Sequence, residues 1–343
     1  MTGVTTPYPQ APTETILRVA SLTKSYALPN SRLAVLQDIE LEVRRGECVA
    51  ITGPSGSGKT TLLALLGALD TPDAGEIWLN EIAVHRLHGM AASDFRRQQV
   101  GFVFQLFYLL PNLTALENVM APLLPYRRTL NFDLKQRATE LLERVGLADR
   151  LGHPPARLSG GEQQRVGVAR AIAARPRVLL MDEPFGAVDA LVRASLQDET
   201  LRIHAALGTT IFFVTHDVDE ALRVADRIVV MDAGKIVQAD TPLHVLARPA
   251  TPYVERLMDS KDAVRRLGLL RVRDAMAPAG DEPAQGRIAA SASLRDALSA
   301  FLAGAERLAV DRDPADASGG GGTGAAALTF ADVRRAVAAT QAA

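Results

Sequence analysis

Residues 47–70 read ECVAITGPSGSGKTTLLALLGALD, which joins an apolar run, a glycine-rich turn and a helical pattern. A glycine-rich turn between a strand and a helix, ending in Lys-Thr, is typical of a phosphate-binding loop. The predicted loop comprises Gly53, Pro54, Ser55, Gly56, Ser57, Gly58, Lys59, Thr60 and Thr61. The stretch therefore predicts a strand at 48–52, a helical pattern at 59–70 and a phosphate site between them.

The residue types of this loop fit that chemistry. Glycines let successive backbone N–H groups turn inward around phosphate oxygens, and the N-terminus of the next helix adds its dipole. Lys59 would neutralise the outer phosphates, and the Thr60 hydroxyl would ligate Mg²⁺. The alternative is a glycine-rich surface turn, but the strand before it and the helix after it favour the phosphate site.

Two acidic residues follow a second apolar run, VLLM at 178–181. Asp182 ends the predicted strand and Glu183 comes next, so one carboxylate can reach Mg²⁺ while its neighbour polarises an attacking water. Strands often end in exposed acids, so the pair gains its meaning from the phosphate loop. Together the two motifs indicate hydrolysis of a nucleotide.

A second anion site is indicated by LSGGEQQRVGVARAI, residues 158–172. Its Ser-Gly-Gly offers backbone donors and a hydroxyl at the start of an amphipathic helix. The chain thus has two anion sites but one lysine-bearing loop. This is explained if the second site covers a nucleotide held by another copy.

Apolar runs and helical patterns alternate along most of the chain. Predicted strands at 48–52, 100–104, 178–182, 210–215 and 227–232 indicate an α/β fold with a largely parallel buried sheet. Residues 15–50 instead read as short alternating strands of an antiparallel sheet. Near residue 259 the composition becomes rich in Arg and Ala, which indicates a separate appendage.

Composition excludes several classes of protein. The 343 residues carry a formal net charge of -1, which gives no general attraction to nucleic acid. The single cysteine, Cys48, excludes an internal disulfide and a cysteine zinc cluster. No run of about 20 apolar residues is present and the start resembles no signal peptide, so we expect any membrane role to act through a partner.

Further motifs occur in an order that resembles the ATP-binding cassette (ABC) family. LSGGE at 158–162 is similar to the family signature LSGGQ, with Glu162 as a departure that leaves Ser-Gly-Gly intact. The other matching elements are Gln105 in VFQ, MDEP at 181–184, AVD at 187–189 and VTHD at 214–217. With Tyr26, they span roughly residues 15–258.

The resemblance implies roles for these residues. Tyr26 would stack on adenine, Glu183 would be the general base, and His216 would contact the γ-phosphate. Thr60, Gln105 and Asp182 would surround Mg²⁺, with Gln105 also sensing a transmembrane partner. Asp189 would lie at a dimer seam, and the signature would act on the partner's ATP through Leu158, Ser159, Gly160, Gly161 and Glu162.

The resemblance also implies domains and partners. We expect a flexible N-terminus at 1–14, an ABC cassette at 15–258 with a helical subdomain at about 106–172, and a small α+β module at 259–343. Two cassettes, a homodimer or a pair with a paralogue, would close on two ATP molecules beneath transmembrane permease subunits. The location would be the cytoplasmic face of the inner membrane, with a periplasmic or extracellular solute-binding protein acting indirectly and no nucleic acid involved.

The sequence resembles two branches of the ABC family, which transport different substrates. DEPF, LQDE and THDVDEA resemble the ATPases of importers for glycine betaine, choline and proline-type osmoprotectants. Residues 101–124 instead resemble the branch for lipoprotein release and macrolide efflux. We favour the importer for two reasons. The efflux branch usually has DEPT where this chain has DEPF, and the efflux branch lacks the C-terminal appendage that this chain has.

The appendage resembles one cystathionine-β-synthase (CBS) type module, in VRDAM at 272–276 and in 288–337. The resemblance nominates Thr329 and Asp332 as a ribose site, or a basic surface as a sensor of ionic strength. The alternative is a degenerate module that aids dimerisation, since DPADASGGGGTGAAA interrupts the usual strand pair. We expect the appendage to modulate hydrolysis, because every catalytic element precedes residue 218.

Two rival classes remain. A soluble cassette protein acting on ribosomes or DNA usually fuses two cassettes or carries a long coiled coil, and neither feature is found here. A nucleotide sensor without turnover would lack the base or the intact loop, whereas Glu183, Lys59 and His216 are present. An active transport ATPase is therefore the favoured interpretation.

Overall fold

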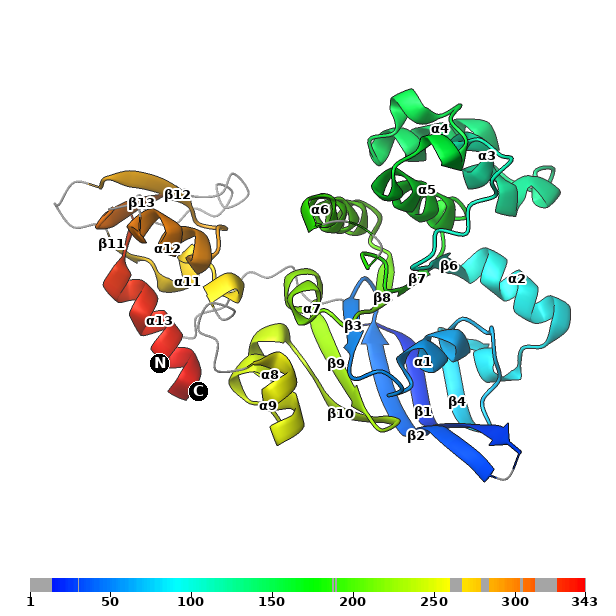
Figure 1. The fold of residues 1–343 in the computed structure, drawn as a ribbon, viewed down its shortest axis with the longest axis horizontal. Coiled ribbons are helices and arrows are strands. Elements are labelled where there is room, and N and C mark those ends of the chain that lie inside the picture. Colours follow the sequence, from blue (N-terminus) through cyan, green and yellow to red (C-terminus); the bar gives the residue numbers. More distant parts are fainter. Residues whose placement is uncertain are drawn as a thin grey trace. The chain divides into compact units, whose positions relative to one another are not determined.

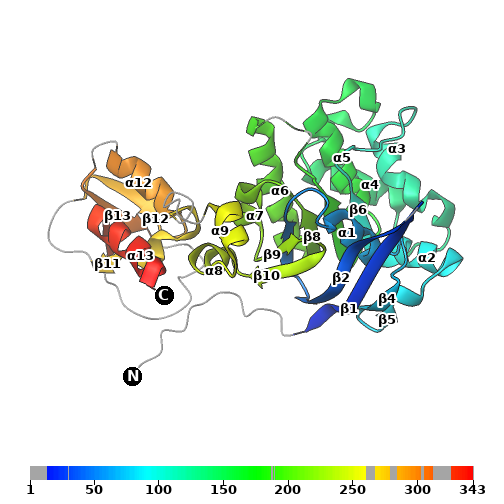
Figure 2. The ribbon, with the colours of Figure 1, turned by 60° about the horizontal axis from the view of Figure 1, so that its bottom comes forward.

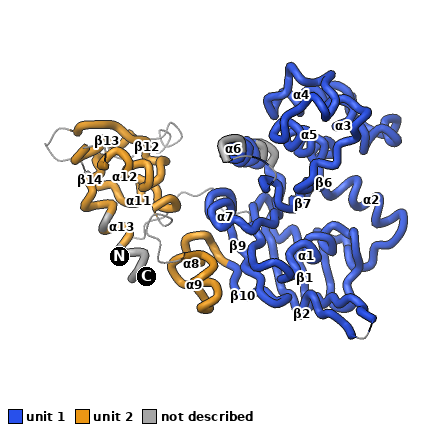
Figure 3. The backbone as a smooth tube through the Cα atoms, in the orientation of Figure 1, with its two compact units in different colours: residues 1–239 blue, residues 240–343 orange. Residues whose placement is uncertain are grey.

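The computed structural model describes residues 14–29, 31–186, 188, 190–259, 267–278, 284–302, 305–311 and 326–342. The chain divides into two compact units, residues 1–239 and residues 240–343 (Figure 3). The predicted division at 258/259 stays a prediction, and residues 1–13 lie outside the described part.

A six-stranded sheet of order β10-β9-β3-β8-β7-β6 forms the centre of the first unit. Its strands are β3 (Cys48–Thr52), β6 (Val100–Val103), β7 (Val178–Asp182), β8 (Thr210–Val214), β9 (Arg227–Asp232) and β10 (Lys235–Asp240). β3 pairs parallel with β8 and β9, and β7 pairs parallel with β6 and β8. Every residue of β3 and β8 is buried, which explains their unbroken apolar sequences.

A second, antiparallel sheet has the order β2-β1-β4-β5. Its strands are β1 (Thr15–Leu28), β2 (Ser31–Arg44), β4 (Ala74–Leu79) and β5 (Ile82–Ala83). β1 and β2 form the long blue hairpin of Figure 2. Buried residues alternate with more exposed ones along β2, so one face of this sheet joins the core that also contains Leu62 and Phe212.

Seven α-helices are described in the first unit. They are α1 (Lys59–Leu66), α2 (Gly89–Gln99), α3 (Ala115–Met120), α4 (Leu134–Arg144), α5 (Gly160–Ile172), α6 (Ala190–Leu207) and α7 (Val218–Val224), with short 3-10 turns at Val84–Arg86, Ala121–Tyr126, Ala148–Arg150 and Pro155–Arg157. α3, α4 and α5 gather beside one another in Figure 1, within the range predicted for a helical subdomain. The α/β class, the parallel core and the antiparallel sheet are confirmed.

The helical pattern at 59–70 extends beyond the helix that forms. α1 ends at Leu66, and Gly67 follows as its C-cap. A Cβ atom on Gly67 would lie 2.2 Å from Phe102 Cζ and 3.0 Å from Leu180 Cδ1. The helix therefore ends where it meets side chains of β6 and β7, a tertiary contact that the local pattern does not contain.

Gly67→Ala should destabilise the cassette. The added methyl group would overpack the contact with Phe102, and overpacking of this kind costs about 1–3 kcal/mol. Thermal unfolding without nucleotide would measure the change in melting temperature. Gly152→Ala is the control, because a Cβ there meets nothing within 4 Å. Equal melting temperatures for both variants would contradict the packing role of Gly67.

The second unit contains helices followed by a small α+β module. Its elements are α8 (Pro242–Ala247), α9 (Pro252–Met258), α11 (Val272–Ala275), β11 (Ala277–Pro278), β12 (Gly286–Ala289), α12 (Leu294–Leu302), β13 (Arg307–Asp311), β14 (Ala326–Thr329) and α13 (Phe330–Ala342). The sheet order is β11-β14-β13-β12, over a core that includes Val272, Leu294 and Leu328. The glycine-rich segment that separates β13 from β14 in sequence lies outside the described residues.

No described helix of either unit is long and apolar enough to cross a membrane.

Candidate functional site

The predicted site residues follow four neighbouring strands at the same edge of the parallel sheet. The phosphate loop follows β3, His216 follows β8, Asp182 and Glu183 end and follow β7, and Gln105 follows β6 (Figure 1). Carboxyl ends of adjacent parallel strands meet at one edge, which is where α/β sheets bind ligands. The fold therefore brings the predicted site residues, which lie far apart in the sequence, to one edge of the sheet.

The phosphate loop has the backbone that its sequence predicts. Gly53 and Gly58 have φ angles of 149° and 98°, a region in which side chains are rarely found. A Cβ on Gly53 would also lie 2.2 Å from the carbonyl oxygen of Met231. The loop thus depends on glycine for both conformation and space. Ser57 Oγ is buried and has no hydrogen-bond partner among the described residues, which leaves it available to a bound oxyanion.

Lys59 lies folded across this loop. Its side chain is largely buried, and Nζ donates hydrogen bonds of 2.9 Å to the carbonyl oxygens of Gly53 and Pro54. Burial lowers the pKa of the Lys59 ammonium, although the carboxylates of Glu183 and Asp182 partly oppose this. An anion in the loop would restore the electrostatic stabilisation that burial removes.

Asp182 and Thr60 form the oxygen pair predicted for Mg²⁺. Thr60 Oγ1 lies 3.4 Å from Asp182 Oδ1. Burial, and then the nearby Glu183 carboxylate, raise the pKa of Asp182, which marks a carboxyl group that a cation would stabilise. The described residues contain no cluster of three His, Cys, Asp or Glu side chains suited to a metal. A hydroxyl and one carboxylate still fit Mg²⁺, which usually completes its shell with phosphate and water.

Glu183 and His216 contact each other. His216 Nδ1 lies 3.1 Å from Glu183 Oε1, a separation that a hydrogen bond spans when Nδ1 carries the proton. Glu183 has a φ of 46°, which is uncommon for a residue with a side chain and recurs at functional sites. Gln105 lies close by, since a Cβ on Gly186 would be 3.3 Å from Gln105 Nε2 and 3.6 Å from Glu183 Oε2.

The signature segment 158–162 begins α5 through a capping box. Ser159 Oγ accepts from Glu162 N (3.3 Å), and Glu162 Oε2 accepts from Ser159 N (2.8 Å). Glu162 also forms an ion pair with Arg150 at 3.0 Å. The hydrogen bond from the Ser159 backbone N–H lowers the pKa of Glu162, and so does the Arg150 guanidinium. The carboxylate that departs from the family pattern is therefore stably ionised. α5 lies beside α3 and α4, apart from α1 (Figure 1).

Two connections escaped the sequence reasoning. Buried Gln164 of α5 donates 2.6 Å to the carbonyl oxygen of Pro184, which ties the signature helix to the segment after Glu183. Arg193 of α6 donates to Val188 O and forms ion pairs with Asp217 and Glu220, on either side of the start of α7. The sequence feature that could have indicated a role for Gln164 is its place in the QQR run after Ser-Gly-Gly. Asp189, predicted at a dimer seam, lies outside the described residues.

Tyr26 is exposed at the end of β1, with 41% of its surface accessible. Its hydroxyl donates a 2.8 Å hydrogen bond to Asp70, shortly after α1. The exposed ring is thus held near the helix that carries the phosphate loop. The stacking role stays a prediction.

Thr329 and Asp332 contact each other at the start of α13. Thr329 N and Oγ1 donate to Asp332 Oδ2 at 3.0 and 2.7 Å, and Arg335 donates to Asp332 Oδ1. Ser293 and Asp296 repeat this arrangement at the start of α12. Both pairs therefore serve as helix caps, and a ribose would have to replace bonds that the carboxylate already makes.

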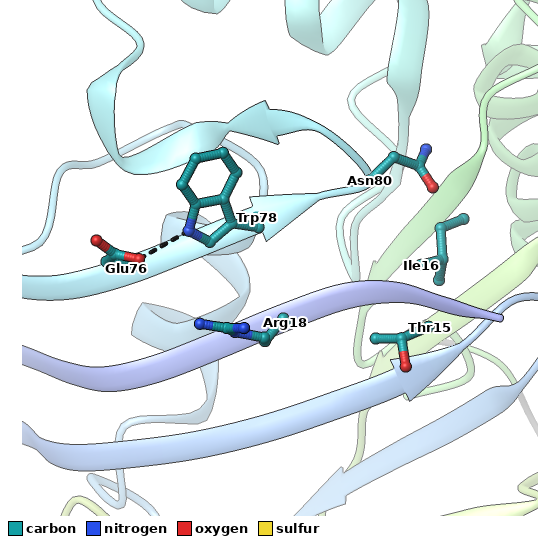
Figure 4. A pocket seen from close by; sticks show the side chains of 6 residues that line it. All are labelled: Thr15, Ile16, Arg18, Glu76, Trp78 and Asn80. Atoms are coloured by element: carbon teal, nitrogen blue, oxygen red, sulfur yellow. Dashed lines mark hydrogen bonds between the residues drawn. The ribbon is translucent and has the colours of Figure 1, made fainter.

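Two cavities lie elsewhere. One, of about 390 Å³, lies on the antiparallel sheet (Figure 4) and is lined by Thr15, Ile16, Arg18, Glu76, Trp78 and Asn80. Trp78 Nε1 donates to Glu76 within it. The other, of about 290 Å³, is lined by residues between 148 and 157. Neither contains a residue predicted for the nucleotide site.

Comparisons with known proteins identify a family and relatives for this chain. A family model described as ABC transporter matches residues 36–186. The chain is 44% identical over 233 residues to the trimethylamine N-oxide transport system ATP-binding protein TmoW of Ruegeria pomeroyi, covering 68% of each chain. It is 44% identical over 245 residues to the sulfate/thiosulfate import ATP-binding protein CysA of Escherichia coli, covering 71% of this chain and 64% of the relative.

A solved structure shares the fold of about two thirds of this chain. It is the dimeric, post-hydrolysis ATP-binding cassette MJ0796 bound to ADP and Pi, with a TM-score of 0.60 and 36% identity. The match covers 66% of this chain and 98% of that chain.

Proposed function

Because this chain belongs to the ABC transporter family, whose ATP-binding proteins hydrolyse ATP to power transport, we propose that it energises import of a methylated-amine osmoprotectant. Glycine betaine and choline are such solutes, and the TmoW relative is named for trimethylamine N-oxide. The observation that carries the ATPase function is the convergence of Lys59, Asp182, Glu183 and His216 at one edge of the parallel sheet.

The residues divide the chemistry between them. Backbone N–H groups of the glycine loop and Lys59 bind the phosphates of ATP, and Tyr26 stacks on the base. Mg²⁺, held by Thr60 and Asp182 with Gln105 nearby, would neutralise charge on the phosphates. Glu183 accepts a proton from the attacking water. His216 Nδ1 lies 3.1 Å from the Glu183 carboxylate, and its other nitrogen would contact the γ-phosphate.

A second cassette completes the site. The Ser-Gly-Gly of α5 belongs to the same chain as the phosphate loop but starts a different helix, apart from α1. We infer that residues 158–162 cover ATP held by a second copy, with Asp189 at the seam. The dimeric state of the MJ0796 cassette supports this arrangement.

The proposal includes partners. Transmembrane permease subunits would bind this chain at the cytoplasmic face of the inner membrane, and a solute-binding protein would deliver the solute on the other side. The name of the CysA relative includes import, which supports import over the efflux alternative. The module at 259–343 would regulate or aid dimerisation, as a CBS-like unit whose Thr329 and Asp332 form a cap.

Sulfate or thiosulfate is the second candidate solute, since CysA is as similar as TmoW in identity. The solute does not meet this chain, so the two candidates are separated by transport and not by the ATP site. The osmoprotectant is favoured by the DEPF, LQDE and THDVDEA segments.

Uptake tests this proposal. Cells that express the chain with its neighbouring permease genes would be given radiolabelled glycine betaine, trimethylamine N-oxide or sulfate. We expect energised uptake of a methylated amine, lost when Glu183→Gln replaces the parent. Uptake of sulfate alone would move the assignment to the second candidate. ATPase activity without uptake of any of the three would favour export or another solute.

A further inference from the structure

A buried lysine and an aspartate hold the ring that is proposed to stack on adenine. Asp70 Oδ2 accepts from the Tyr26 hydroxyl at 2.8 Å, and Asp70 Oδ1 accepts from Lys24 Nζ at 2.9 Å. Lys24 is 7% exposed, and Nζ also donates 2.6 Å to the carbonyl oxygen of Thr71. One carboxylate therefore fixes two side chains of β1 at once.

The lysine also lies against the ring itself. Lys24 Nζ is 5.0 Å from the centroid of the Tyr26 ring, within the range of a cation–π contact. Burial and the Asp70 carboxylate raise the pKa of Tyr26, while a hydrogen bond with Thr61 lowers it. The hydroxyl thus stays protonated and donates its hydrogen to Asp70, on the segment after α1.

These contacts join the two ends of the nucleotide site. Asp70 follows α1 by four residues, and α1 begins at Lys59 of the phosphate loop. Tyr26 comes from the antiparallel sheet, whose strands approach this segment from another part of the chain. Asp70 and Lys24 therefore tie the Tyr26 ring to the segment that follows α1.

We propose that Asp70 and Lys24 are positioning residues that fix Tyr26 as a preorganised platform for the base of ATP. The inference rests on the proposed ATP site and names residues that the motifs do not include. Preorganisation lowers the conformational entropy lost on binding, so it contributes to affinity and not to the chemical step.

Binding of two probes tests the proposal in the full chain. ADP contacts both the platform and the phosphate loop, whereas inorganic tripolyphosphate can contact only the loop. We expect Asp70→Ala to raise the dissociation constant of Mg–ADP about fivefold to tenfold and to leave that of tripolyphosphate within about twofold. In steady-state hydrolysis, KM for ATP should rise while kcat stays nearly constant.

Further variants separate positioning from folding. Tyr26→Phe keeps a stacking ring but removes the hydroxyl, so Asp70→Ala should have a much smaller effect in that background. Asp70→Asn keeps an acceptor and should fall between parent and Asp70→Ala, which provides a second variant if alanine fails to fold. Asp73→Ala is the matched control, because the Asp73 carboxylate accepts from Ser25 N and Oγ, whereas that of Asp70 accepts from Tyr26 and Lys24.

The outcomes divide cleanly. Equal weakening of ADP and tripolyphosphate by Asp70→Ala or Asp70→Asn would overturn the platform in favour of a general role in supporting α1. Unchanged ADP affinity would overturn it as well. A parent protein that binds neither probe would instead refute the proposed ATP site, and with it this inference.

Discussion

Glu183→Gln should lower the rate of ATP hydrolysis by about 10²- to 10⁴-fold, the usual contribution of a general base. Glutamine has nearly the same shape, so it can keep its place beside His216 but cannot accept the proton of the attacking water. The φ of 46° is retained, because the change affects only the end of the side chain. ATP binding should therefore survive, and the variant should accumulate as a dimer with ATP bound.

Phosphate release measured beside equilibrium ATP binding checks this expectation. Glu140→Gln on α4 is the control. It removes the same charge from a helix that carries no predicted site residue, so the rate should stay unchanged. Hydrolysis by Glu183→Gln at the parental rate would assign the base to another group. A loss of binding as large as the loss of turnover would make Glu183 a structural residue.

The parts of the fold that follow from local pattern were predictable. The strands at 48–52, 178–182 and 227–232 are buried on both faces and so read as continuous apolar runs. The phosphate loop was predictable for a different reason, because Gly53 and Gly58 adopt backbone angles that favour glycine. The local sequence pattern thus predicted these strands and the strand ends that the predicted site residues follow.

Contacts between distant segments were not predictable. The hydrogen bond of Tyr26 with Asp70 spans 44 residues. The hydrogen bond of Gln164 with Pro184 joins α5 to the turn after β7, and no sequence motif indicates that these two segments touch. Gly67, which follows the end of α1 at Leu66, packs closely against Phe102 of β6, another contact between distant segments. Glu162 read as a departure from LSGGQ, yet its carboxylate caps α5 and pairs with Arg150, so the acid stabilises the start of the helix.

Lys59→Ala should remove most of the nucleotide affinity. The ammonium is largely buried beside two backbone carbonyls, and in the proposed ATP site it would meet the charge of the outer phosphates. Loss of one partner from such a charge pair costs about 2–5 kcal/mol, a factor of roughly 30 or more in the dissociation constant. Hydrolysis should fall with it at any moderate ATP concentration.

Ligand-induced stabilisation gives a readout that does not depend on turnover. ATP at about 100 times its dissociation constant should stabilise the parent by about 2.7 kcal/mol, and the same concentration should have little effect on Lys59→Ala. Without nucleotide the variant should lose some stability of its own, because the carbonyl oxygens of Gly53 and Pro54 lose the hydrogen bonds from Lys59 Nζ. The effect of ATP is therefore measured as a shift from each protein's own nucleotide-free melting temperature. Lys135→Ala, on the exposed side of α4, should keep the full shift. A Lys59→Ala protein that keeps it too would show that backbone N–H groups alone hold the phosphates, and the lysine would then act only on the transition state.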